Sequence, residues 1–90
     1  MMVVTDKAKD ALKKLLTLNS HDPHDSLRLA CKRSGQLGFI LGEETDSDRV
    51  ITYEGLKVLL IDRELESLLT ETVLTVNKTN GKREFVISKS

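Results

Sequence analysis

The chain has 90 residues, enough for one small domain, since two separate cores would leave each half too little surface to bury. Hydrophobic residues make up 39% of the chain and charged residues 31%, a balance typical of globular rather than disordered proteins. Fourteen basic residues match fourteen acidic ones, so the formal net charge is zero and the basic surface of a nucleic-acid binder is not indicated. We therefore expect one domain over residues 1–90 and no nucleic-acid partner.

The single cysteine, Cys31, excludes an internal disulfide and a cysteine-rich metal cage built within one chain. Aromatic residues are only 3%, without tryptophan, so platforms for stacking bases or sugars are not expected. The N-terminus reaches Asp6 before a signal-peptide hydrophobic region could form. No uncharged run approaches the roughly 20 residues needed to span a bilayer. These features predict a cytoplasmic protein with no membrane partner.

An amphipathic helix is predicted from about Asp6 to Leu18. Thr5 is placed to cap its N-terminus, and apolar residues recur at helical spacing on one side. Because this stripe lacks aromatic anchors, we expect it to cover a sheet rather than to bind a membrane. Its members are Ala8, Ala11, Leu12, Leu15 and Leu16.

After the helix the hydrophobic period changes to two, which predicts a strand from Leu27 to Cys31 with one buried face. Cys31 is in phase with Leu27 and Leu29, so we expect it to point into the core as a small hydrophobe. If the side chain turned outward instead, the adjacent Lys32 and Arg33 would lower the pKa of the thiol and activate it.

Two glycines, Gly35 and Gly38, predict a tight reversal into a short strand over residues 39–41. The loop joins strands and does not open a helix, so it is not expected to cradle a phosphate. The acidic stretch over residues 43–48 lacks the spacing of a calcium loop and is expected to be a solvated turn.

The second half of the chain is predicted to contain strands over residues 50–53 and 56–61, then a short helix that Asp62 caps. The helix should run to about Leu69, with Leu65 and Leu68 also facing inward. Asn80-Gly81 is the favoured pair for a two-residue hairpin turn, which predicts a hairpin with arms over residues 72–77 and 83–88. The chain is therefore mainly β, with a helical cover and one core.

The order of these elements, and four phrases within them, resembles the HesB/IscA family of A-type iron–sulfur carriers. This resemblance implies a small β-sandwich/barrel hybrid with an N-terminal amphipathic helix and one short internal helix. The phrases are Val4-Thr5-Asp6-Lys7-Ala8, Leu27-Arg28-Leu29 with Ser34-Gly35-Gln36-Leu37-Gly38-Phe39, Gly55-Leu56-Lys57-Val58-Leu59-Leu60-Ile61-Asp62, and Arg83-Glu84-Phe85-Val86-Ile87.

The cluster ligands of that family have no match in this sequence. The family has a cysteine between the two loop glycines, where this chain has Gln36, and a Cys-Gly-Cys tail beyond the last strand, whereas this sequence stops at Ser88-Lys89-Ser90. Iron–sulfur clusters are ordinarily held by four ligands, mostly thiolates, and a glutamine amide cannot replace one. The resemblance thus implies a degenerate member, for which we expect neither a cluster nor another cofactor.

Other candidates for chemistry are few. His21 and His24 lie with two carboxylates in one loop, and imidazole with carboxylate suits zinc or nickel. A solvated loop is nevertheless expected, because no third rigid element is known to converge on this loop. No serine or cysteine has a histidine placed by a motif, so we predict no catalytic residues and no enzyme activity.

The sequence supports two hypotheses about function. The first is a non-catalytic HesB-like domain with a protein-interaction or structural accessory role, whose partner is an unknown protein or a second copy of the chain. The alternative is an accessory in iron–sulfur cluster or metal delivery, in which Cys31 or the His21/His24 loop supplies ligands together with a partner.

Overall fold

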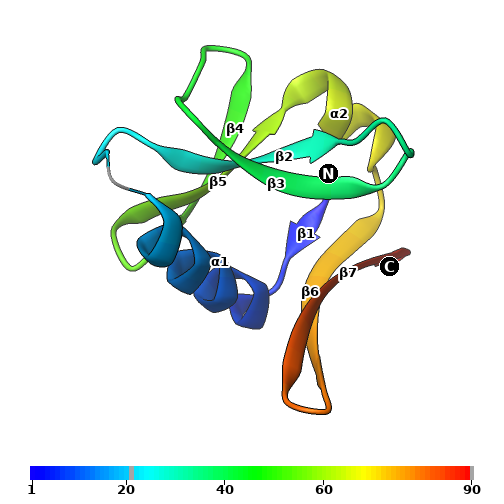
Figure 1. The fold of residues 1–90 in the computed structure, drawn as a ribbon. Helices are drawn as coiled ribbons and strands as arrows, with labels where there is room; N and C mark the ends of the chain where they lie inside the picture. The colour runs from blue at the N-terminus through cyan, green and yellow to red at the C-terminus, as the bar shows by residue number, and fades with distance from the viewer. Residues whose placement is uncertain (21, 90) are drawn as a thin grey trace.

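The computed structural model describes residues 1–20 and 22–89 (Figure 1). The chain is mainly β, with two helices, as predicted. Its elements in chain order are β1 (Val3–Val4), α1 (Asp6–Asn19), β2 (Ser26–Cys31), β3 (Leu37–Gly42), β4 (Asp48–Tyr53), β5 (Leu56–Asp62), α2 (Arg63–Leu68), β6 (Thr72–Thr79) and β7 (Lys82–Lys89).

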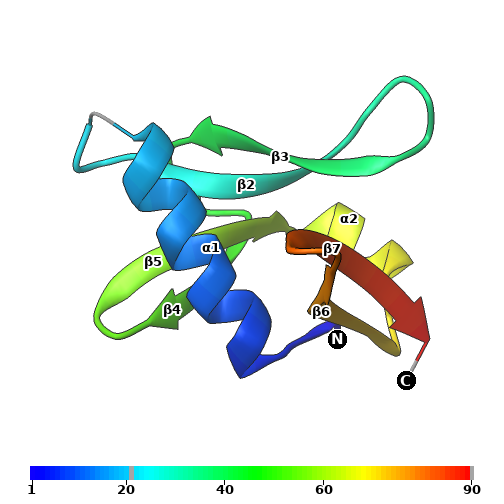
Figure 2. The same ribbon diagram turned by 60° about the horizontal axis from the view of Figure 1, so that its bottom comes forward.

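The strands form two sheets that lie against a shared core. One sheet has the order β3-β2-β5-β4, with β2 and β5 parallel and the other pairs antiparallel. The other has the order β1-β6-β7. Within the described residues the two sheets share no strand. They therefore form the two layers of the predicted sandwich, without a closed barrel. Figure 2 shows α1 crossing one face of the larger sheet, with β6 and β7 near the N-terminal end of the helix.

Helix α1 begins where predicted, because the Thr5 Oγ1 accepts a hydrogen bond from the backbone N–H of Ala8 at 3.2 Å. Its apolar stripe is buried against both sheets, with Ala8 and Leu12 completely inaccessible. The central strand β5 supplies the other half of this core through Val58, Leu59 and Ile61, which are also fully buried. No helix in the described part of the chain is long and apolar enough to cross a membrane.

The turns of the β4–β5 and β6–β7 hairpins follow from residues that tolerate a left-handed backbone. Asn80 and Gly81 have φ of 52° and 78°, which matches the turn predicted between β6 and β7. Glu54 and Gly55, with φ of 51° and 81°, make the same kind of turn between β4 and β5.

Strand β1 is not evident in the sequence. Val3 and Val4 pair in parallel with Val73 and Leu74 of β6, so the N-terminus joins the sheet formed by the last part of the chain. The backbone N–H of Thr5 extends this contact by donating to the carbonyl of Leu74 at 3.0 Å.

The predictions about the burial of Leu68 and of the acidic stretch are wrong. Leu68 is 80% exposed, because a helix of six residues presents only one side to the core and Leu65 and Leu69 occupy that side. The acidic stretch is not a purely solvated turn, because Asp48 is buried at the start of β4 and forms an ion pair with Arg28 of β2.

Candidate binding surface

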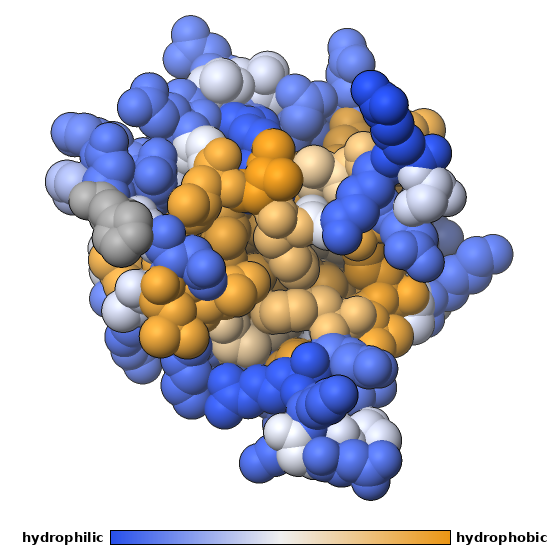
Figure 3. Space-filling model, viewed as in Figure 1, coloured by the Kyte–Doolittle hydropathy of each residue, from blue (hydrophilic) through white to orange (hydrophobic). Residues whose placement is uncertain are grey.

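A pocket of about 380 Å³ lies between the β2–β3 hairpin and the β6–β7 hairpin. In Figure 3, apolar residues occupy the middle of this face, and polar residues surround them. The apolar lining comes from both sheets, and Gln36 adds a carboxamide from the loop between β2 and β3. The lining residues are Leu29, Gly35, Gln36, Leu37, Phe39, Leu74, Phe85 and Ile87.

Strand alternation brings these side chains to one side. Leu29 lies opposite Phe39 in the β2–β3 hairpin, and Leu74 lies opposite Ile87 in the β6–β7 hairpin; side chains of directly opposed residues share a face. The two sheets touch where the rings of Phe39 and Phe85 pack edge to face, with centroids 4.7 Å apart and planes at 65°.

The loop that carries Gln36 is held in a defined shape. The Lys32 N–H donates to the carbonyl of Gln36 at 2.7 Å, and the Gly35 N–H donates to the carbonyl of Lys32 at 2.9 Å. Gly35 has φ of 84°, a conformation that favours glycine. At Gly38 a β-carbon would lie 2.5 Å from Cε of Lys32, so the missing side chain lets Lys32 lie across the hairpin. Of the two predicted glycines, Gly35 thus shapes the loop that carries Gln36, whereas Gly38 lies within β3 opposite Ala30.

The prediction that Cys31 points into the core is wrong. Cys31 is exposed, and its Sγ lies 3.6 Å from the carbonyl oxygen of Lys32. It shares a face with the buried Leu29, as the alternation indicated, but it is the last residue of β2 and lies beyond the covered part of that face. The thiol is therefore on the pocket side of the sheet, opposite Leu37.

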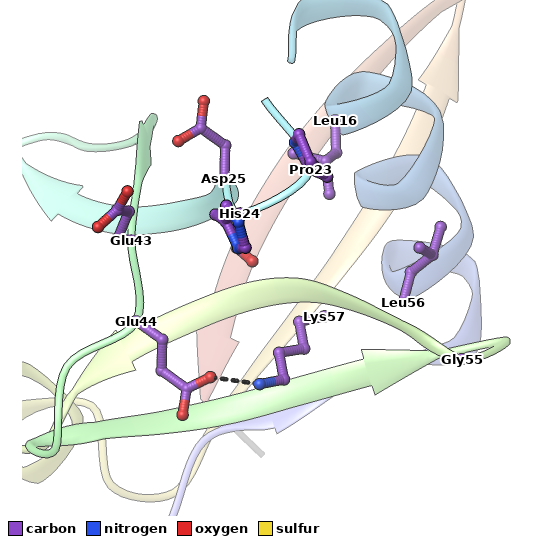
Figure 4. A pocket seen from close by; sticks show the side chains of 10 residues that line it. Leu16, Pro23, His24, Asp25, Glu43, Glu44, Gly55, Leu56 and Lys57 are labelled. Atoms are coloured by element: carbon purple, nitrogen blue, oxygen red, sulfur yellow. Dashed lines mark hydrogen bonds and ion pairs between the residues drawn. The ribbon is translucent and has the colours of Figure 1, made fainter. Parts of the chain in front are cut away.

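The histidine loop borders a different, polar recess of about 660 Å³ (Figure 4). His24 lies there near Asp25, Glu43 and Glu44. The Glu44 carboxylate binds Lys57 at 2.7 Å, and the carboxylates of Asp25 and Glu43 point away from His24. Within the described residues, no three His, Cys, Asp or Glu side chains are arranged to hold a metal ion. His21 lies outside the described residues.

The sequence matches no protein-family model, and no curated protein was found to be similar to it. Solved structures are similar in fold. The crystal structure of Escherichia coli SufA, which is involved in biosynthesis of iron–sulfur clusters, has a TM-score of 0.68 and 17% identity over 98% of this chain and 84% of that one. A structure of IscA with the [2Fe-2S] cluster has a TM-score of 0.64 and 17% identity over 99% and 85%. The chain thus has the fold of the HesB/IscA-like A-type iron–sulfur carriers that its sequence resembles.

Proposed function

We propose that this chain is a single, non-catalytic HesB-like domain that acts by contact with another protein and does not itself hold an iron–sulfur cluster. The observation that carries the proposal is Gln36, which stands at the edge of the apolar pocket in the loop position where the resembled family has a cysteine. A neutral carboxamide is a weak ligand for iron but a good hydrogen-bond donor and acceptor for a peptide group. The accessory role would be cytoplasmic.

The pocket supports a binding role. Concave apolar surfaces with a few polar groups at their edge are the usual places where proteins bind ligands and the anchoring side chains of partners. Here six apolar residues from two sheets form such a surface, and the Gln36 amide is the polar group beside it.

The test is reconstitution with ferrous iron and sulfide without oxygen, with IscA, whose structure contains a [2Fe-2S] cluster, treated in parallel as the positive control. We expect iron and acid-labile sulfide far below one cluster per two chains, with no visible absorption band of a cluster. Stoichiometric iron and sulfide that survive gel filtration would contradict the proposal. A Gln36→Ala variant should match the unmodified protein, because the amide is not a ligand.

One observation favours a second function, delivery of a cluster or metal jointly with a partner. The exposed thiol of Cys31 lies on the pocket side of β2, where a partner seated on the pocket could complete a ligand set. Zinc titration by calorimetry would compare the unmodified chain with Cys31→Ala and with a double His21→Ala, His24→Ala variant. Zinc binding by the unmodified chain that one of these substitutions removes would favour the delivery function. If none of the three proteins released or absorbed heat on addition of zinc, these residues would be excluded as ligands without a partner.

A further inference from the structure

The side of the β6–β7 hairpin that faces the pocket has a regular pattern of cations and apolar residues. Phe85 and Ile87 line the pocket, so the residues at every second position of β7, and those opposite them on β6, share that side. From the turn outward, the opposed pairs on this side are Lys78 with Arg83, Val76 with Phe85, Leu74 with Ile87, and Thr72 with Lys89. An apolar centre is therefore bounded by positive charge at both ends.

This positive charge is not neutralised within the described residues. Six ion pairs link other charged residues of the chain, whereas Lys78, Arg83 and Lys89 take part in none of them. The one carboxylate of the hairpin, Glu84, lies opposite Asn77 and so projects from the other side of the sheet. Lys78 and Arg83 also border a recess against α1, in which the one lining carboxylate, Asp10, is already paired with Lys14 at 3.1 Å. The surface beside the apolar pocket is therefore locally basic, although the net charge of the chain is zero.

Strand β7 also has a free edge. In the order β1-β6-β7 it pairs, among the residues that the structure describes, only with β6, and this pairing runs over eight residues from Lys82 to Lys89. The unpaired N–H and C=O groups of such an edge can bind an extended peptide as an additional strand. A strand added there would have its alternate side chains over the pocket.

We propose that this edge and pocket bind an extended acidic segment of a partner protein, with carboxylates at both ends of the motif and two apolar residues between them, at every second position. The apolar side chains would contact Phe85 and Ile87, and the carboxylates would pair with Arg83 and Lys89. The proposal rests on the contact role proposed above and names the chemistry of the partner.

The pattern favours a peptide over other polyanions. Nucleic acid or an anionic membrane needs clustered cations, whereas along β7 Arg83 and Lys89 are separated by five residues, of which Phe85 and Ile87 lie on the pocket side. The two phenylalanines pack against each other, so their faces do not form a platform for stacked bases.

The test measures fluorescence anisotropy of the labelled peptide Glu-Thr-Val-Thr-Val-Thr-Glu titrated with the full chain. We expect saturable binding that weakens as salt is added. An Arg83→Glu, Lys89→Glu double variant should bind about tenfold or more weakly, because two attractive pairs become repulsive. Lys82→Glu, on the same strand but the opposite side, should stay within about twofold of the unmodified chain.

The inference would be overturned if the peptide did not bind, or if a peptide with lysine in place of glutamate bound equally well. It would also be overturned if the double variant and Lys82→Glu lost the same affinity, or if an RNA oligonucleotide or anionic vesicles bound more tightly than the peptide. Self-association that the peptide does not displace would assign the surface to a second copy and would also overturn it. A negative result with the peptide would not contradict the proposed absence of a cluster, because that is tested by the iron and sulfide content, which is measured without the peptide.

Discussion

The guanidinium of Arg28 on β2 reaches across β5 and donates to both carboxylate oxygens of Asp48 on β4, at 2.7 and 2.5 Å. The Asp48 side chain is completely buried and also accepts from the backbone N–H of Thr45 at 2.8 Å. The same guanidinium donates to the carbonyl of Glu43 at 2.9 Å. The Arg28–Asp48 ion pair therefore holds the acidic β3–β4 connection against the larger sheet.

Replacing Asp48 with asparagine should destabilise the fold by about 3 kcal/mol, because it leaves the Arg28 charge without its buried partner. Urea denaturation measures the free energy of unfolding. The control is Asp46→Asn in the exposed part of the same connection, which should change it by less than about 0.5 kcal/mol. Equal effects of the two substitutions would show that the Arg28–Asp48 pair does not hold the connection.

The same pair predicts loss of stability in acid. Hydrogen bonds from Arg28 and Thr45 hold the pKa of Asp48 at about 2, below the usual 3.8. Folding therefore favours the carboxylate, and this contribution is complete above pH about 4 and is lost as the pH falls towards 2, by at most about 2 kcal/mol. Urea midpoints measured across this range should fall less steeply for Asp48→Asn. Parallel profiles for the variant and the unmodified chain would count against the assigned pKa.

The exposed Cys31 thiol should react with a disulfide reagent in the folded protein. We expect complete modification of one thiol per chain at a rate within about tenfold of that in denaturant, since no folded layer covers the sulfur. Absorbance of the released thiolate follows the reaction, with Cys31→Ala as the unreactive control. That variant should keep its stability within about 0.5 kcal/mol. Strong protection of the thiol in the folded state would mean that Cys31 is buried after all.

Two leucines of α1 should differ sharply in their contribution to stability. Leu12 is completely buried between the helix and both sheets, so Leu12→Ala should cost about 3 kcal/mol through lost burial and the cavity that remains. Leu18 is 79% exposed, and Leu18→Ala should cost less than about 0.5 kcal/mol. Denaturation of the two variants tests whether α1 packs as described; similar losses would contradict this packing.

Local signals in the sequence predicted most of the elements. The Thr5 cap, the Asn80-Gly81 turn and the Asp62 cap depend on neighbouring residues alone, and all three are present. The loop that positions Gln36 was also predictable, because two glycines close together indicate a tight reversal. The resemblance to HesB/IscA proteins then predicted the arrangement of the elements, which the solved structures match.

Burial at the ends of elements was not predictable in this way. Alternation correctly placed Cys31 on the face of Leu29, but whether that face is covered depends on how far β6 and β7 extend over it. The sequence around Asp48 indicates a solvated carboxylate, because its charged partner, Arg28, is twenty residues away in sequence. The pocket combines residues between positions 29 and 39 with residues between positions 74 and 87, so no local pattern marks it.

The parallel pairing of β1 with β6 also bears on how the chain is synthesised. Val4 pairs with Leu74, seventy residues later in the sequence. Strand β1 therefore leaves the ribosome long before the residues of β6 are synthesised. Until then Met2 and Val4, both buried in the finished protein, are open to solvent or to chaperones. Closure of the fold therefore has to wait for β6, and should be slow for a protein of this size because its contacts join distant residues.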